Sequence, residues 1–379
     1  MPELTVVMCA ACTGGEVIDG VCRGCGVAAD PAEAPRVELP LLTASRMRCF
    51  RTCPRLHQLR YVEGWRPVNE AEALRFGTLM HLGLEAWWRA AGGAPVELCD
   101  GCASVVTTRE PIDAALCAVH GRAYDPYEQV RLDELLIGYD ARWRDAAAEY
   151  EVIAVECEYR APQINPGTMK TGRTWELGGK IDAIARRRSD GHVLVVEHKT
   201  TSEEISSDVD HYWQTLALDG QISGYVIGAE ALGHQVDEVL YDVIRKVTIR
   251  PLRATPVESR KYTKDGRLYA AQREADETVD EYRARVRASI AEDMPRFFQR
   301  RSIPRTESQI RDYLQDAWQL GRAMREMELD RHAPRNPAAC HQYGTCSMWL
   351  VCSTGSHPSQ FQAEFRLAGN VNPELNGGK

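Results

Sequence analysis

The chain has 379 residues, of which 44% are hydrophobic and 26% charged, and its formal net charge is −8. These values are ordinary for a globular protein and exclude a disordered or fibrous chain. No apolar run approaches the ~20 residues of a membrane-spanning helix, and no basic segment leads into an apolar one at the N-terminus. We therefore expect a cytoplasmic protein that does not bind membranes. The acidic balance argues against a uniformly basic nucleic-acid coat, but it says little about local patches.

The first 35 residues read as a small separate module that ends in a Pro-rich linker. They hold two Cys-x2-Cys pairs, formed by Cys9, Cys12, Cys22 and Cys25. Such paired knuckles can hold one tetrahedral zinc ion, which stabilises a segment too small to bury a core. The spacing predicts a zinc ribbon over residues 1–35.

Helical patterns follow from Thr43, with Thr43 or Ser45 as the N-cap, then over residues 69–91 and 124–149. Residues 95–123 interrupt this pattern with Gly and Pro and are interpreted as an insertion. Four potential ligands lie in the interruption, namely Cys99, Cys102, Cys117 and His120. They predict a second structural zinc site, so that two zinc ions are expected in the chain.

Three β runs are expected at residues 151–160, 175–187 and 192–198, and the first alternates with Ile153, Val155, Cys157 and Tyr159 on its inward face. Beyond them we expect a helix over 208–229, a strand over 236–244 and helices over 278–300 and 306–328. Residues 353–379 form a polar tail that we expect to be partly disordered. The overall pattern indicates an α/β fold.

The second and third β runs form a predicted hairpin that carries three charged residues. Alternation places Glu197 and Lys199 on one face of the strand and His198 on the other. A two-residue turn at residues 190–191 would place Asp182 opposite Lys199 on the same face. Two converging carboxylates suit Mg²⁺ or Mn²⁺, and a lysine beside them can orient water or stabilise phosphate charge. The spacing alone is more typical of an exposed hairpin face with an ion pair of ~0–1 kcal/mol than of a metal site.

These positions resemble the RecB-like branch of the PD-(D/E)xK nuclease superfamily in the segments 178–182 (GGKID), 197–201 (EHKTT), 221–225 (QISGY) and 77–81 (GTLMH). The resemblance implies a nuclease core over residues 36–352, in which helices flank a central mixed sheet. It also implies that His81, Asp182 and Glu197 bind Mg²⁺ or Mn²⁺ and that Lys199 assists the attacking water. By the same resemblance, Gln221 and Tyr225 line the active site and help to place DNA, although helix packing alone would also explain their spacing.

Cys340, Cys346 and Cys352 recur near the end of the nuclease region, and Cys53 lies at its start. One early cysteine and three late ones resemble the iron-sulfur nucleases of the RecB type, including AddB-type and CRISPR-associated exonucleases. The resemblance implies a [4Fe-4S] cluster that joins the ends of the domain and is structural rather than catalytic. Zinc or unligated thiols remain alternatives. Cys49, one helical turn before Cys53, competes as the fourth ligand.

The resemblance thus implies a metal-dependent deoxyribonuclease, with a preference for single-stranded DNA and free ends, that acts as an exonuclease. Recombination, phage DNA processing and CRISPR adaptation use such enzymes, and proteins of these systems are possible partners. The competing hypothesis is a non-catalytic DNA-binding or scaffolding module that retains the nuclease fold. Candidate phosphate-binding residues are basic side chains at 186–188, 245–246, 250, 253 and 300–301. No P-loop sequence occurs, so the chain should not itself be a nucleotide-driven motor.

Overall fold

The computed structural model describes residues 38–69, 72–93, 110–207, 210–342, 344–372 and 375, and the backbone of three short strands nearer the N-terminus. The chain divides into two compact units, Met1–Pro40 and Leu41–Lys379. In the first unit an antiparallel sheet comprises β1 (Val7–Met8), β2 (Glu16–Ile18) and β3 (Val21–Cys22). Within these described parts, no helix has the length and apolar character needed to cross a membrane.

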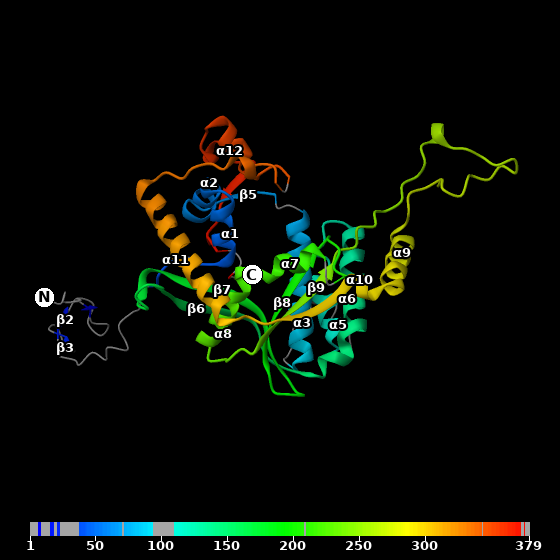
Figure 1. Ribbon diagram of the computed structural model, residues 1–379. Helices are drawn as coiled ribbons and strands as arrows, with labels where there is room; N and C mark the ends of the chain where they lie inside the picture. Colours follow the sequence, from blue (N-terminus) through cyan, green and yellow to red (C-terminus); the bar gives the residue numbers. More distant parts are fainter. Residues whose placement is uncertain are drawn as a thin grey trace. The chain divides into compact units, whose positions relative to one another are not determined.

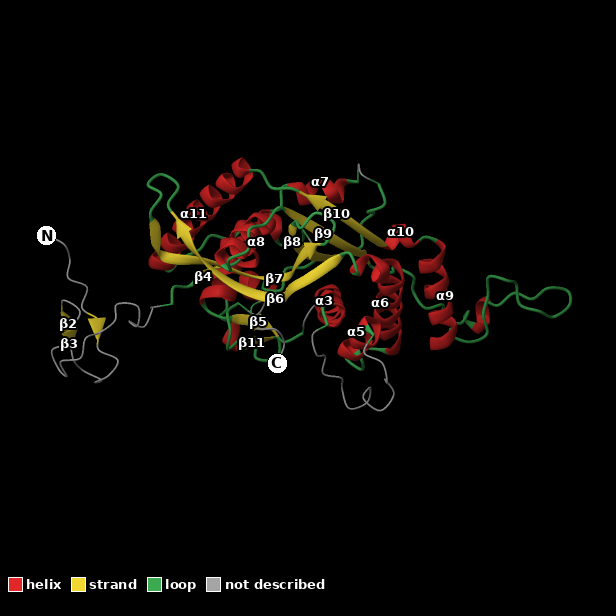
Figure 2. Ribbon diagram, turned by 90° about the horizontal axis from the view of Figure 1, so that it is seen from below, coloured by secondary structure: helices red, strands yellow, loops and turns green. Residues whose placement is uncertain are grey.

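The second unit is built on a six-stranded mixed sheet in the order β10-β9-β8-β7-β4, with β6 also paired to β7 (Figure 2). Its strands are β4 (Leu41–Leu42), β6 (Tyr150–Ile164), β7 (Thr171–Arg187), β8 (Val193–Thr201), β9 (Glu238–Arg245) and β10 (Phe298–Ile303). The β4–β7 and β8–β9 pairs are parallel and the others antiparallel. Parallel pairing of β8 with β9 requires a crossover, and two helices provide it. This is the predicted α/β architecture with a central mixed sheet.

Helices cover both faces of the sheet (Figures 1 and 2). One face packs against α3 (Glu72–Ala91), α5 (Pro111–Val119), α6 (Pro126–Ala147) and α9 (Val279–Glu292). The opposite face packs against the crossover helices α7 (His211–Ala217) and α8 (Gly220–Ala231). A third core lies around Trp175, where α1 (Ala44–Thr52) and α11 (Glu307–Asp330) meet β4 and β7. The sheet is therefore buried on both sides.

A smaller lobe joins segments from the two ends of this unit. It contains α2 (Pro54–His57), the π-helix η1 (Gln58–Val62), β5 (Trp65–Pro67), the 3-10 helices η3 (Pro337–Ala339) and η4 (Pro358–Gln360), α12 (Trp349–Thr354) and β11 (Phe365–Leu367). Strands β5 and β11 pair antiparallel, and Leu59, Met348, Val351 and Phe365 form its core. The predicted tail thus takes part in the fold through residue 372, and its last residues, apart from 375, lie outside the described ones.

Of the two predicted N-caps for the first helix, Thr43 is the one observed, because its Oγ1 accepts a bond from the backbone N–H of Arg46 (3.1 Å). Several other predicted boundaries change. The predicted helix over 278–300 is α9 and α10 (Met294–Phe297) followed by strand β10, and the helix over 208–229 is interrupted between α7 and α8. The insertion is narrower than predicted, since α5 buries Ala115 and Val119 in the core. Of that predicted interruption, only residues 95–109 lie outside the described ones.

Candidate active site

The β7–β8 hairpin brings the predicted charged residues to one face. Ala183 pairs with Val196, so Asp182 lies level with Glu197 rather than with Lys199. The prediction of a two-residue turn is therefore wrong: residues 188–191 form a four-residue connection, closed by a bond from Arg187 N–H to the carbonyl of His192 (2.8 Å). The predicted turn has two residues and the observed one has four. Because the difference is even, Asp182 still lies on the predicted face of the sheet.

Asp182 lies where the two strands begin to separate. One oxygen of its carboxylate, Oδ2, accepts a bond from the backbone N–H of His198 (2.8 Å). The same oxygen lies 3.6 Å from Nδ1 of His81, which reaches it from α3. Gly77, one turn earlier on α3, permits this approach, because a Cβ there would lie 3.3 Å from Oγ1 of Thr200. The helix therefore delivers the predicted histidine to the predicted carboxylate.

Glu197 and Lys199 continue the site along β8. The Lys199 ammonium lies 2.5 Å from Oε1 of Glu197 and donates to Oε1 of Gln221 (2.7 Å). The Gln221 amide donates in turn to the hydroxyl of Tyr225 (2.7 Å), one turn along α8. Asp219, at the N-cap of α8, lies 3.8 Å from the same ammonium. All six predicted site residues, from α3, β7, β8 and α8, thus gather at one place, and Lys199 is held by two neighbours.

The pKa values of the two carboxylates of the site are shifted in opposite directions. Burial raises the pKa of Glu197 to about 7, with Lys199 opposing the rise and Asp182 adding to it. Burial would also raise the pKa of Asp182, but His81 and the N–H of His198 hold it at about 2. Loss of solvent lowers the pKa of His81, yet contact with Asp182 reverses this effect and leaves it raised. A cation between the two carboxylates would relieve their repulsion.

One oxygen of Glu197, Oε2, is buried and has no hydrogen-bond partner among the described residues. A buried carboxylate oxygen without a partner is costly unless an ion or water completes its bonding. Two carboxylates and an imidazole form a donor set suited to Mg²⁺ or Mn²⁺. The described residues contain no preformed group of three or more His, Cys, Asp or Glu side chains with metal-binding geometry. The chemistry of these residues nevertheless fits a divalent ion.

The sequence interpretation missed Glu156, which lies on β6 in the same cleft. Its neighbours pair with Ala183 and Ile181, so it lies level with Asp182. Burial raises the pKa of Glu156, Asp182 adds to the rise, and the ion pair with Lys180 opposes it. Its φ of +55° departs from regular strand geometry, and this turns its side chain inward. Simple alternation, which assigned charged residues of this strand to solvent, contains no signal for such a position.

The predicted inward face of β6 is altered by a second irregularity besides the backbone angle of Glu156. A register shift lies at Ile153, between the pairs of Val152 and Ala154. Ile153, Cys157 and Tyr159 belong to the core on the α8 side, whereas Val155 packs against the opposite core. The prediction was therefore right for three of the four residues and wrong for Val155.

The cleft has a volume of about 620 Å³. Besides the site residues, basic side chains enter its wall, namely Arg48, Arg122, Lys180 and Lys246. Arg48 approaches the Gln221 amide oxygen at 3.5 Å. Among the candidate phosphate-binding residues, Lys246 therefore lies at the cleft. Arg300 does not, because it is buried in an ion pair with Asp242 (3.1 Å) behind β8.

The four cysteines predicted to hold a cluster line one cavity of about 900 Å³ in the small lobe: Cys53, Cys340, Cys346 and Cys352. The backbone N–H of Asn336 points to Sγ of Cys53 (3.4 Å), and the Asn336 amide binds the carbonyl of Thr52 (2.8 Å). Burial raises the pKa of the Cys346 thiol, with Cys340 and Cys53 adding to the rise. The four thiols therefore share a cavity, and each is a free thiol.

Cys49 differs from these four residues. It is buried and does not line the cavity. Burial raises its pKa to about 11, although Arg60 and Arg66 oppose the rise. This position favours Cys53 over Cys49 as a member of the thiol group. Cys157, predicted to lie on the inward face of its strand, packs against the core on the α8 side.

The predicted zinc sites fall largely outside the described residues. Cys22 lies in β3, whereas Cys9, Cys12 and Cys25 are outside those residues. In the second set, Cys99 and Cys102 are outside them. Cys117 is buried on α5, and the N–H of His120 at the helix end donates to its carbonyl (3.2 Å). Both zinc ions stay predictions.

Comparison with known families identifies the fold. The family model described as the PD-(D/E)XK nuclease superfamily matches residues 41–353, which include all the gathered residues and the four cysteines of the cavity. No curated protein matches the chain. The match begins at β4, directly after the first unit. The chain belongs to the PD-(D/E)XK nuclease superfamily.

Proposed function

We propose that the protein is a Mg²⁺- or Mn²⁺-dependent deoxyribonuclease whose metal ligands are His81, Asp182 and Glu197. The observation that carries the proposal is the buried, unpartnered Oε2 of Glu197 beside a second carboxylate. Structural ion pairs in a fold usually satisfy both oxygens of a buried carboxylate. The carboxylate of Glu197 lies at a site that also contains the Lys199 ammonium and the His81 imidazole.

A bound divalent ion would polarise the scissile phosphate and lower the pKa of a water molecule. In this proposal the Lys199 ammonium is held in one position and has two functions. Its ammonium, held by Glu197 and Gln221, orients the attacking water and stabilises the negative charge that develops on phosphate oxygens. Gln221 and Tyr225 fix the position of that ammonium and form the wall against which the nucleotide lies.

The finer assignment is an exonuclease that prefers single-stranded DNA with free ends. The cleft is lined by four basic side chains outside the ligand set and is about 620 Å³ in volume, which suits a narrow strand more readily than a rigid duplex. We assign its biological setting to DNA processing of the recombination or CRISPR-adaptation type, with partner proteins from those systems. The competing module hypothesis predicts the same binding without cleavage.

The test uses linear and covalently closed circular single-stranded DNA, with Mn²⁺, Mg²⁺ or EDTA. We expect cleavage of the linear strand only, and no cleavage in EDTA. Asp182→Asn should abolish cleavage and weaken Mn²⁺ binding measured by calorimetry, at unchanged circular dichroism. The matched control is Asp312→Asn, an exposed carboxylate on α11. DNA binding without cleavage in Mn²⁺ would support the module, and cleavage of the circle would make the enzyme an endonuclease.

We further propose that Cys53, Cys340, Cys346 and Cys352 hold a [4Fe-4S] cluster. Their shared cavity supports this donor set, since four thiolates are the usual ligands of such a cluster. Burial raises the pKa of the Cys352 thiol, and Arg55 and Arg335 oppose the rise. These positive charges would partly neutralise the negative charge of four thiolates. Anaerobically purified protein should be brown and contain about four iron and four sulfide per chain. Colourless folded protein with one extra zinc would assign the cavity to zinc instead.

A further inference from the structure

A long arm, residues 250–277, leaves the body of the protein between β9 and α9 and projects away from it (Figure 1). All of these residues are described, and only Glu277, at its root, is buried. Val257, Tyr262 and Tyr269 are 73%, 52% and 52% exposed. The arm therefore has no apolar core of its own, and its order must come from hydrogen bonds.

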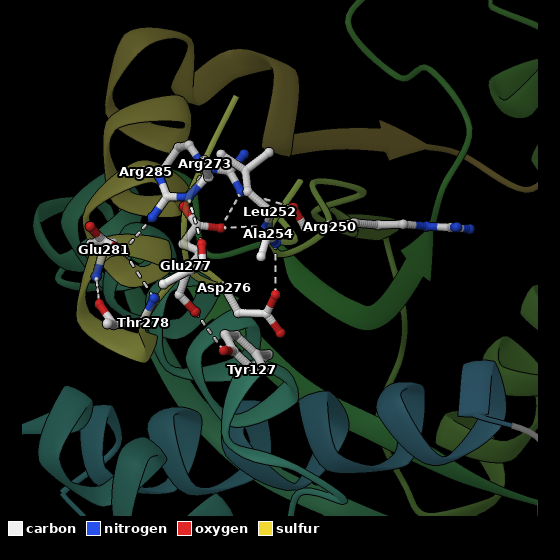
Figure 3. A network of polar contacts seen from close by, with 11 residues as sticks. Tyr127, Arg250, Leu252, Ala254, Arg273, Asp276, Glu277, Thr278, Glu281 and Arg285 are labelled. Carbon is white, nitrogen blue, oxygen red and sulfur yellow. Dashed lines mark hydrogen bonds and ion pairs between the residues drawn. The ribbon is translucent and has the colours of Figure 1, made fainter. Parts of the chain in front are cut away.

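The root of the arm is fixed to the helical layer by a polar network (Figure 3). Glu277 accepts from Arg285 (2.8 and 2.7 Å) and from the N–H of Leu252 (2.8 Å). Asp276 accepts from Arg253 and from the N–H of Ala254, both at 2.8 Å. These bonds tie the outgoing and returning segments of the arm to each other and to the first turns of α9.

Further bonds brace the arm along its length. The N–H of Thr255 donates to the carbonyl of Arg273 (2.9 Å), and Tyr269 and Lys261 are joined by a backbone bond (3.1 Å). Near the tip, the N–H of Thr263 donates to the carbonyl of Arg267 (2.7 Å), and Gly266 takes a φ of +75° to close the turn. A projection braced in this way holds its tip at a defined place relative to its root.

The tip has a strongly basic and aromatic composition. Residues 259–269 contain four basic side chains and one acidic one: Arg260, Lys261, Lys264 and Arg267 against Asp265. Asp265 lies 3.6 Å from Arg267, and both side chains are more than 70% exposed. Arg260 binds backbone carbonyls. No carboxylate of the described residues forms an ion pair with Lys261 or Lys264, so their charges face solvent. This local excess contrasts with the net charge of −8 for the chain.

Resting on the proposed function, we propose that the arm is a second DNA contact, which holds the strand that extends beyond the cleft. Lys261 and Lys264 would neutralise phosphates, and Tyr262 and Tyr269 would stack on bases, the combination that binds single strands without sequence preference. The arm begins four residues after Lys246, which lines the cleft. The chain itself thus connects the catalytic site to the arm. An acidic protein partner would use the lysines but would not need both exposed aromatic rings.

The test measures binding of single strands of about 40 and about 8 nucleotides by the full-length protein in EDTA, with salt varied between about 50 and 200 mM. Lys261→Gln/Lys264→Gln should lower the slope of log affinity against log salt by about 1.4 for the long strand, because each phosphate contact contributes about 0.7. Tyr262→Ala/Tyr269→Ala should weaken long-strand binding by about 5- to 160-fold per stacked base at an unchanged slope. The losses should be smaller for the short strand.

The matched control is Arg311→Gln/Arg322→Gln, which removes two exposed charges from α11 and should keep the wild-type slope. Arm variants that bind the long strand like the wild type would overturn the proposal and leave a protein partner as the function of the arm. An arm-dependent salt slope in a protein that cleaves nothing in Mn²⁺ would support the arm and overturn the nuclease activity. Normal cleavage in Mn²⁺, together with DNA binding that the arm variants do not change, would support the nuclease activity and overturn the proposal for the arm.

Discussion

The buried ion pair behind β8 allows a quantitative prediction. Asp242 is fully buried, and Arg300 Nη2 lies 3.1 Å from its Oδ2. The same guanidinium donates to the hydroxyl of Tyr139 (2.8 Å) and lies over the ring of Trp143 (4.4 Å). His198 Nδ1 lies 3.3 Å from the same carboxylate oxygen. The pair therefore supports the strand whose backbone N–H binds Asp182.

Arg300→Met removes the positive charge but keeps most of the aliphatic volume. It leaves the Asp242 carboxylate buried without its cation, which costs about 3–5 kcal/mol of unfolding free energy. Unfolding entropy of ~2.1 cal/mol/K per residue amounts to roughly 0.7 kcal/mol/K for a unit of about 340 residues, so Tm should fall by roughly 4–7 °C. Cleavage should fall as well, because β8 carries Glu197 and Lys199 and its backbone N–H at His198 binds Asp182.

The stability deficit should depend on pH. Burial raises the pKa of Asp242, but Arg300 and His198 outweigh it and hold the pKa well below its usual range. In the wild type this contribution is fully present above the unfolded carboxyl pKa of about 3.9 and is lost as pH falls from there through the depressed pKa of the folded state. In the variant, the cost of a buried charge disappears once Asp242 is protonated. Calorimetry should therefore show the largest deficit near neutral pH, a smaller one near pH 4 where the wild-type contribution is still present, and a further decrease below that.

Two further variants serve as controls. Arg186→Met breaks an exposed pair with Glu151 (3.0 Å) and should cost about 0–1 kcal/mol. Arg300→Met/Asp242→Asn removes both charges and should recover much of the loss, which gives a favourable coupling in the double-mutant cycle. A single variant that loses less than about 1 kcal/mol, or a double variant whose loss equals the sum of the two single losses, would refute the reasoning.

Two predictions concern the cavity and the active site. Cys53→Ala should abolish visible absorption and iron content, whereas Cys49→Ala should keep both, because only the former lines the cavity; equal loss in the two variants would contradict this assignment. Gln221→Ala removes the partner that joins Lys199 to Tyr225 and should lower kcat by about 10- to 100-fold with little change in KM. A pure rise in KM would instead show that Gln221 only binds substrate.

The site residues could be predicted because their placement depends on strand parity and helical spacing. Asp182, Glu197 and Lys199 share a face for any hairpin turn with an even number of residues, so an incorrect turn length still placed them together. His81 was found through the resemblance, and Gly77 explains physically why α3 can approach β8. These features are local, and a local pattern is sufficient to specify them.

Features that depend on tertiary partners escaped the prediction. The sequence of β10 is charged and therefore predicts a continuation of the helix before it. Arg300 can be buried in this strand only because the acid that neutralises it, Asp242, lies on β9. Glu156 turns inward through an irregular backbone angle that the sequence does not signal. The arm has neither the apolar periodicity of a helix nor the alternation of a buried strand. Its order depends on hydrogen bonds to Glu277 and α9.

The small lobe changes what the cysteine cavity means for stability. If the cluster alone joined the ends of the domain, its loss would unfold the nuclease region first. The ends are also joined by the β5–β11 pairing and by the amide of Asn336, which binds the carbonyl of Thr52. The core of the lobe, around Leu59 and Phe365, is separate from the cores that pack on the sheet. Loss of the proposed cluster should therefore loosen the lobe while the β7–β8 hairpin keeps its fold, so that folding and cleavage can be measured separately in protein without the cluster.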